Sequence, residues 1–190
     1  MRIVLGMTGA SGAIYGYALL RTLAELGAEL HIVMTRMGEQ VLKFECGISK
    51  KELKEFGKVW NNDNMFAPIA SGSFVTQGMV IIPCSMNTLG AIANGIGDTL
   101  MSRAASVQLK ERRRLIVVPR ETPLHLIHLQ NMERLLMAGA QIMPASPGFY
   151  QKPQEIWELT NFMVARVLDS LEIDHNLGPR WGEVEPPLED

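Results

Sequence analysis

Residues 8–15 read TGASGAIY and directly follow the apolar stretch RIVLGM. Backbone N–H groups in such a segment can hold a phosphate at a helix N-terminus, Ser11 can be a nucleophile on a sharp turn, or the segment can be a tight turn that Ser11 caps. The glycine spacing lacks the G-x-G pair of dinucleotide sites and the lysine of a nucleotide P-loop, and Ala13 breaks the G-x-S-x-G pattern of hydrolases. A mononucleotide phosphate site, a plain turn and, more weakly, a hydrolase all stay open at this point.

The stretch PCSMNT, residues 83–88, ends a second apolar run. It offers hydroxyl, amide and backbone groups to a ligand, and Ser85 is equally well suited to cap a helix. Both interpretations stay open from the residues alone.

Four basic residues stand out by their placement. Arg103 and Lys110 are seven positions apart on one predicted helix and therefore share a face, while Arg120 leaves a predicted strand at its carboxyl end. Arg166 lies on a predicted apolar helix face, where an unpaired guanidinium would be costly and a bound phosphate would satisfy it. Residues 112–114 are better explained as a solvated rim.

Glu45 and Glu121 are candidate proton carriers, although spacing alone favours salt bridges with the arginines. His125 and His128 can share a helix face, where packing is a better explanation than a metal site, because no further ligand accompanies them. His31 is predicted to lie in a strand and His175 on the surface. No metal site is predicted.

Five apolar, β-branched runs recur at 2–7, 29–35, 79–85, 114–120 and 140–146. They are continuous rather than alternating, which is typical of parallel strands covered on both faces. Between them lie predicted helices: 11–26, a short one opened by the Ser49–Glu52 capping box, one capped by Asp98 and running to about 111, one opened by Thr122-Pro123 and ended by Gly139, and 153–171. This order predicts an α/β doubly wound parallel sheet, a Rossmann or flavodoxin-like three-layer sandwich with ligands at the carboxyl ends of its strands.

Length and composition limit the classes of protein to which the chain can belong. The 190 residues suit one domain, predicted as 1–175 with a C-terminal tail at 176–190, and the formal net charge of −2 argues against a nucleic-acid binder. Cys46 and Cys84 have neither zinc nor disulfide spacing, which favours a reducing compartment. We find neither a signal-peptide core nor an apolar run long enough for a membrane span, and we expect a cytoplasmic protein.

Taken together and in this order, the segments MTGASGAIYG, PCSMNTL, SRAASVQLKERR, VPRETPLHLIHL, PASPGFYQKPQ and PRWGE resemble the flavin prenyltransferases. These are small FMN proteins that partner the ubiquinone-pathway and phenylacrylate decarboxylases and were once called decarboxylases themselves. The resemblance covers nearly the whole chain. It implies a homo-oligomer, expected to be a dodecamer with sites at subunit interfaces.

The resemblance also implies an activity. A dimethylallyl unit from dimethylallyl phosphate is joined to N5 and C6 of reduced FMN, and the prenylated FMN serves a client decarboxylase. The chain has no D-D-x-x-D motif, so a metal-free site with a monophosphate donor is expected.

Site residues follow from the same resemblance. Ser11 and Glu45 match polar residues implicated in proton transfer, Glu121 and Lys110 complete the expected catalytic set, and Trp181 matches a family tryptophan. The expected FMN contacts are Gly9, Ala10, Ser11, Thr35, Ser85, Met86, Asn87, Thr88 and Arg120. The expected prenyl phosphate contacts are Arg103, Lys110, Arg120, Glu121, Tyr150 and Arg166.

Three alternatives stay open. An FMN-dependent cysteine or phosphopantothenoylcysteine decarboxylase is the nearest, but that class is expected to need a histidine between the second and third strands, where this chain has none. A serine hydrolase built on Ser11 has only His175 late enough in the chain. A non-catalytic flavin carrier would not need a second phosphate site.

Overall fold

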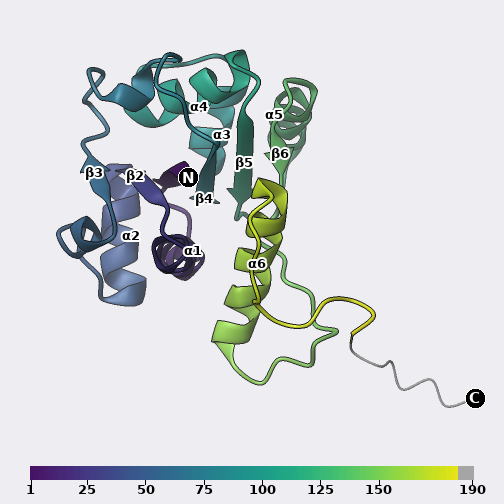
Figure 1. Ribbon diagram of the computed structural model, residues 1–190. Coiled ribbons are helices and arrows are strands. Elements are labelled where there is room, and N and C mark those ends of the chain that lie inside the picture. The colour runs from purple at the N-terminus through teal and green to yellow at the C-terminus, as the bar shows by residue number, and fades with distance from the viewer. Residues whose placement is uncertain (184–190) are drawn as a thin grey trace, which may run out of the picture.

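The computed structural model describes residues 1–183 (Figure 1). Six parallel strands form one sheet in the order β3-β2-β1-β4-β5-β6. The strands are β1 (Arg2–Met7), β2 (Glu29–Met34), β3 (Lys58–Trp60), β4 (Gly78–Cys84), β5 (Arg114–Pro119) and β6 (Gln141–Ile142).

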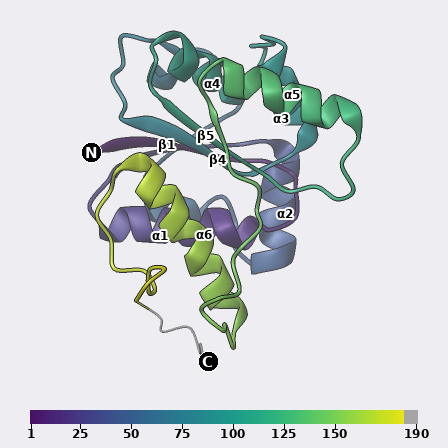
Figure 2. The same cartoon turned by 90° about the vertical axis from the view of Figure 1, so that its right-hand side faces the viewer.

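Helices cover both faces of the sheet, as Figure 2 shows. In β1, Ile3, Leu5 and Met7 pack against α1, α2 and α6, whereas Val4 packs on the opposite face with α3, α4 and α5. Strands buried on both faces need apolar residues at every position, which explains the continuous runs in the sequence. The helices are α1 (Ala13–Glu25), α2 (Arg36–Cys46), α3 (Met86–Ala93), α4 (Leu100–Lys110), α5 (Leu126–Met137) and α6 (Ile156–Leu171), with short 3₁₀ turns at Glu52–Glu55 and Pro68–Ala70.

The strand order reverses between β1 and β4, which lie side by side at the centre of the sheet. The chain leaves β1 toward β2 on one side and leaves β4 toward β5 on the other. Such a switch point opens a crevice at the carboxyl ends of the two central strands. The TGAS segment after β1 and the CSMN segment after β4 both begin there. The predicted doubly wound fold is therefore confirmed.

Two sheet elements differ from the prediction. The run predicted at 140–146 pairs regularly only over Gln141–Ile142. Met143 and Ala145 still donate N–H groups to carbonyls of β5, but Pro144 has no N–H to offer and the regular ladder ends before it. The short edge strand β3 has one polar and two partly exposed residues and was not predicted.

Helix starts also differ. Gly12, at φ 98°, is the N-cap of α1 in place of Ser11, and Thr99 rather than Asp98 caps α4, because its hydroxyl accepts from the Ser102 N–H. The Thr122–Pro123 bond is cis, and α5 starts only at Leu126, after His125 as N-cap. Helix α6 begins at Ile156 instead of 153, and helix α2 was missed. Only half of the predicted Ser49–Glu52 capping box forms: the Glu52 carboxylate accepts from the Ser49 N–H at 2.8 Å and from its hydroxyl at 2.6 Å, whereas the Glu52 N–H donates to the Ser49 carbonyl.

The first half of α6 extends beyond the body of the domain, below α1 in Figure 2. Its leading residues Ile156 and Trp157 are 72% and 55% exposed, and Phe149 in the preceding loop is 69% exposed. Apolar side chains on a projecting element are typical of surfaces that bind another protein. Among residues 1–183, no helix has the length and apolar character that a membrane crossing requires.

Candidate active site

Thr8 fastens the two central strands together at the switch point. Its side chain is almost fully buried, and its hydroxyl donates to the Pro83 carbonyl at 2.8 Å and accepts from the Ser85 N–H at 2.7 Å. This arrangement fixes the start of the TGAS turn relative to the start of α3. Sequence reasoning passed over Thr8, although a hydroxyl next to a buried strand end was a usable signal.

Glu45 reaches back from the end of α2 to the first turn of α1. Its Oε2 accepts N–H groups from Gly12 at 2.9 Å and from Ala13 at 2.8 Å. Burial opposes ionisation, but hydrogen bonds from the Ser11 side chain and from these two N–H groups, with the nearby charge of Arg120, lower the pKa of Glu45. The expected phosphate cradle at the α1 N-terminus is therefore taken up, in this chain, by its own carboxylate.

Arg120 joins the same cluster from the end of β5. Its Nε donates to the Ser11 carbonyl at 3.1 Å, and its backbone N–H donates to the Cys84 carbonyl at 3.2 Å. Ser11, Glu45 and Arg120, which are far apart in sequence, thus meet at one edge of the sheet. The arrangement combines a cation, an ionised carboxylate and a hydroxyl.

Two further helices begin at this edge with hydroxyl caps. Thr35 accepts from the Gly38 N–H at 3.0 Å at the start of α2, and Ser85 accepts from the Thr88 N–H at 3.4 Å at the start of α3. Helix N-termini carry partial positive charge and suit an anion such as a nucleotide phosphate. The remaining predicted FMN contacts lie on these turns: Gly9, Ala10, Met86, Asn87 and Thr88.

Gly9 is required by close packing between the turn and α2. A Cβ on Gly9 would lie 2.5 Å from the Met37 Cβ, far inside normal contact distance. The turn can pass the start of α2 at this spacing only because residue 9 has no side chain.

Glu121 directly follows Arg120 and is exposed, and its Oε1 accepts from the Thr122 N–H at 3.0 Å. The described residues provide it with no ion-pair partner, so the salt bridge that spacing favoured is not formed. Its carboxylate remains available to a ligand.

Another group of predicted site residues lies beside α6, where Tyr150 and Arg166 line a cavity of about 480 Å³, here called the second cavity. Phe162, Arg180 and Trp181 contribute to the same wall, and the Tyr150 ring meets the Trp181 ring edge-on with centroids 5.0 Å apart. The expectation of an unpaired Arg166 on an apolar face is wrong, because its Nη1 donates to Asp169 at 2.9 Å and its side chain is 55% exposed. A carboxylate one turn along the helix satisfies the charge that the sequence argument assigned to a phosphate.

Arg103 and Lys110 form no hydrogen bond or ion pair with either group among the described residues. Arg103 donates its Nε to the Ala70 carbonyl at 3.0 Å, and Lys110 pairs with Glu111. Lys110 ends α4 just before β5 begins, so it lies at the amino edge of the sheet, opposite the TGAS turn. The described chain does not bring these two cations to the other predicted site residues.

The histidines lie outside this cluster. His31 is buried in β2, as predicted, and accepts from the Trp60 Nε1–H at 3.0 Å. His125 and His128 stack with centroids 3.4 Å apart.

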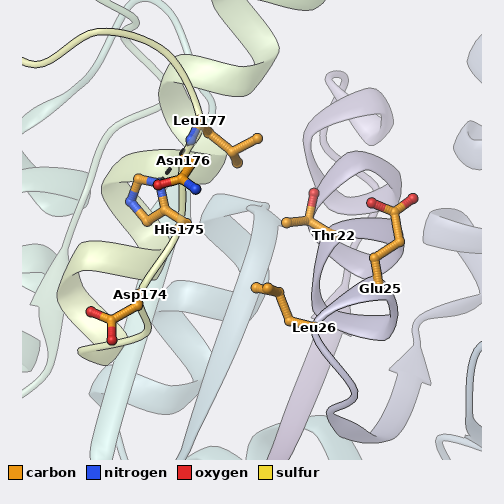
Figure 3. Close-up of a pocket in the computed structure, with 7 residues that line it drawn as sticks. All are labelled: Thr22, Glu25, Leu26, Asp174, His175, Asn176 and Leu177. Atoms are coloured by element: carbon orange, nitrogen blue, oxygen red, sulfur yellow. Dashed lines mark hydrogen bonds between the residues drawn. The ribbon is translucent and has the colours of Figure 1, made fainter.

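The prediction of a surface His175 is wrong, because its side chain is only 5% exposed. It lines a cavity of about 380 Å³ between the segment after α6 and the end of α1, where Thr22 and the C-cap residue Leu26 form the opposite wall, as Figure 3 shows. The residues 1–183 contain no cluster of three or more potential metal-ligating side chains.

Comparison with known proteins agrees with this geometry. Residues 1–168 match the Flavoprotein family. The flavin prenyltransferase UbiX of Halalkalibacterium halodurans is 47% identical over 190 residues, covering 94% of this chain and 92% of that protein.

Two solved structures align over nearly the whole chain. AnUbiX in complex with FMN and dimethylallyl pyrophosphate aligns with a TM-score of 0.94 and 45% identity, covering 97% of this chain and 98% of that one. A dodecameric FMN-dependent UbiX-like decarboxylase from Escherichia coli O157:H7 aligns with a TM-score of 0.93 and 42% identity, covering 95% and 99%. The chain described here belongs to the Flavoprotein family and, within it, to the flavin prenyltransferases.

Proposed function

We propose that this protein joins the dimethylallyl unit of dimethylallyl phosphate to N5 and C6 of reduced FMN and releases phosphate. The observation that carries the proposal is the near-complete match to AnUbiX, whose structure holds FMN together with dimethylallyl pyrophosphate. The prenylated FMN then passes to a client decarboxylase.

The switch-point edge fits a flavin mononucleotide. Thr35 and Ser85 open two helices there, Gly9 lets the turn lie close to α2, and Arg120 adds a positive charge. We assign the FMN phosphate to the helix starts rather than to α1, because Glu45 already occupies the N–H groups of Gly12 and Ala13. Reduced FMN supplies the nucleophile, so the chain needs none of its own.

The protein's own contribution is positioning and charge. Tyr150 and Arg166 bind the prenyl phosphate, with Arg103 and Lys110 of neighbouring subunits, and their donors stabilise negative charge on the departing phosphate. Arg120 and Glu121 lie where the two substrates meet, and Glu121 acts with the phosphate as acid or base. Holding the allylic carbon against the flavin lowers the entropic part of the barrier. Since the sequence has no aspartate-rich motif, cationic side chains take the role that metal ions have in diphosphate chemistry.

Ser11 and Glu45 form a proton relay in this proposal. The lowered pKa keeps Glu45 ionised at neutral pH, and the hydrogen bond from Ser11 gives the hydroxyl a neighbouring base. Ser11 can therefore take a proton from the substrate as it passes its own to Glu45.

We propose a homo-oligomer, a dodecamer by analogy with the structure from Escherichia coli, as the working form. The placement of Arg103 and Lys110 and the exposed apolar start of α6 support a site completed by neighbouring subunits.

We further propose that residues 1–175 act as one domain and that 176–190 form a tail, of which 184–190 lie outside the described residues. The free thiols of Cys46 and Cys84 support a cytoplasmic location.

One experiment tests the activity directly. The purified protein is incubated anaerobically with reduced FMN and dimethylallyl phosphate, and the flavin mass is measured. A gain of one C5 unit is expected. An unchanged flavin would contradict the proposal. Carbon dioxide release from an aromatic acid by this protein alone would instead support the activity for which the family was once named. The second cavity with Arg166 and Tyr150 favours an enzyme over a passive flavin carrier.

A further inference from the structure

Asp169 is the point at which three side chains around the second cavity converge. Its Oδ2 accepts from Arg166 at 2.9 Å, while its Oδ1 accepts from Arg180 at 3.0 Å and from His175 at 3.2 Å. Arg166 belongs to the same helix as Asp169, whereas His175 and Arg180 belong to the segment after it. One carboxylate therefore ties a predicted substrate residue to the C-terminal part of the chain.

The hydrogen bonds around His175 determine which of its two ring nitrogens carries the proton. The Leu177 N–H donates to His175 Nδ1 at 3.1 Å, shown by the dashed line in Figure 3, so Nδ1 is an acceptor. In a neutral imidazole the other nitrogen, Nε2, then carries the proton and donates to Asp169. His175 thus supports the carboxylate without needing a charge.

The segment 173–181, here called the C-terminal arm, closes one side of the cavity. Besides His175 and Arg180, it is held by Gln151, whose Nε2 donates to the Pro179 carbonyl at 2.6 Å. The arm ends with Trp181 against Tyr150. Asp169 and Gln151 are therefore the two polar anchors that place Trp181 at the cavity wall.

The charges leave the cavity attractive to an anion. Two guanidinium groups and one carboxylate give a net charge of one positive unit when His175 is neutral. Burial opposes ionisation of Asp169, but hydrogen bonds from Arg180 and His175 outweigh it and lower the pKa of the carboxyl. Arg166 has five N–H donors, and a single contact with Asp169 leaves others for a ligand.

We propose that Asp169 is a positioning residue for the prenyl phosphate. It holds the Arg166 guanidinium at the cavity wall and anchors the C-terminal arm, so that Arg166 and Trp181 are arranged around Tyr150 before the substrate enters. Such pre-arrangement strengthens binding because fewer side chains must be ordered when the ligand arrives. This inference rests on the proposed function for the identity of the ligand, but not for the arrangement of the arm.

Asp169→Asn is the decisive variant, because it keeps the shape and removes the charge. We expect KM for dimethylallyl phosphate to rise about 10- to 100-fold, with kcat changed less than about threefold, as for the loss of a charged hydrogen bond. FMN affinity should not change. Asp169→Glu restores the charge and should recover part of the loss.

Glu172→Gln is the matched control. It removes one carboxylate three residues further on, which pairs with Arg114 instead of the cavity arginines. Its KM for dimethylallyl phosphate should equal that of the unmodified protein. An unchanged KM in Asp169→Asn, or a loss of kcat alone, overturns the proposal.

Hydrogen exchange separates the positioning role from the activity. In Asp169→Asn, amides of the C-terminal arm, Leu177 above all, should exchange faster, while those of β1 and β4 keep their protection. Binding of inorganic phosphate, measured by calorimetry, should weaken in parallel. If the unmodified protein fails to prenylate FMN, the proposed function fails. In that case, unchanged arm exchange and unchanged phosphate binding in Asp169→Asn would overturn the positioning role separately.

Discussion

At the scale of single residues, Glu45 and Glu121 differ in what surrounds them. Glu45 caps the first turn of α1 and is held by several hydrogen bonds, whereas the carboxylate of Glu121 contacts only the next backbone N–H among the described residues. Glu45, besides its proposed part in the proton relay, stabilises the start of α1, so changing it should affect both stability and turnover, whereas changing Glu121 should affect turnover alone. The two acids therefore lead to different predictions.

Replacing Glu121 by glutamine should leave FMN bound and lower kcat by about 10²- to 10⁴-fold, the usual contribution of a general acid or base. Single-turnover measurement of prenylated FMN checks this result. Glu133→Gln, on the exposed side of α5, is the control and should keep full activity. Unimpaired product formation by Glu121→Gln would remove Glu121 from the mechanism.

Replacing Glu45 by glutamine should lower the free energy of unfolding by about 0.5–1 kcal/mol at pH 7, because the helix N-terminus loses a facing charge. The folded pKa of Glu45 is lowered, so its stabilisation is complete above the unfolded pKa of about 4.3 and is lost as the pH falls through the folded pKa. Urea unfolding at pH 7 and pH 3 checks this dependence. A stability difference that is equal at both pH values would contradict it.

How far residue patterns predict a site depends on whether the partner is local. The hydroxyl caps at Thr35 and Ser85 follow from one segment each and could be read from the sequence. The Glu45 contact with Gly12 spans 33 positions, and Asp169 draws in an arginine and a histidine from the following segment. Such partners are set by tertiary packing, which is why Asp169 and Thr8 were missed. The Arg166 partner is different, because Asp169 lies three residues further along the same helix and could have been found from the sequence.

At the scale of elements, strands were easier to predict than helix ends. Runs buried on both faces, such as 79–85, are marked by apolar residues at every position. The edge strand β3 and helix α2 carry mixed polarity because one side meets solvent, and their pattern does not separate them from a loop. Helix starts were misplaced by one to four residues, since neighbouring residues such as Asp98 and Thr99 are both good caps.

The contact between Thr8 and the end of β4 should matter for stability and for FMN binding. Thr8→Val removes the hydroxyl and leaves the partly buried Ser85 N–H without its acceptor, which should cost about 1–2 kcal/mol. Thr8→Ser keeps the hydroxyl and is the control. Chemical denaturation of both variants measures the difference, and equal stability would show that the hydroxyl does not hold the strands.

The approach of the TGAS turn to α2 gives a second prediction at this scale. Gly9→Ala places a Cβ 2.5 Å from the Met37 Cβ, so the turn must shift, and FMN affinity should fall at least about tenfold. Gly97→Ala is the control, because a Cβ there meets nothing within 4 Å. Fluorescence titration with FMN compares the two. Equal affinities would mean that the turn does not contact the flavin.

At the scale of the whole molecule, the predicted site residues form two groups and two outlying cations. Ser11, Glu45 and Arg120 meet at the switch point, Tyr150 and Arg166 line the cavity by α6, and Arg103 and Lys110 stand apart. A family resemblance names such residues without saying which copy of the chain supplies each one. Complementation between variants addresses that question.

Lys110→Ala and Arg166→Ala should each be nearly inactive alone as homo-oligomers. Unfolding and refolding them as a mixture should restore part of the activity, because some sites then receive both intact residues from different copies. The measured quantity is prenylated FMN formed per site. Activity no higher than the mean of the two separate variants would contradict sites shared between subunits.

The projecting half of α6 has a consequence for how the protein responds to dilution. In the proposed homo-oligomer a neighbouring copy covers Ile156 and Trp157, so part of the free energy that holds the helix in place depends on protein concentration. The melting temperature should therefore rise with the logarithm of concentration. We expect full activity only at protein concentrations at which the homo-oligomer forms.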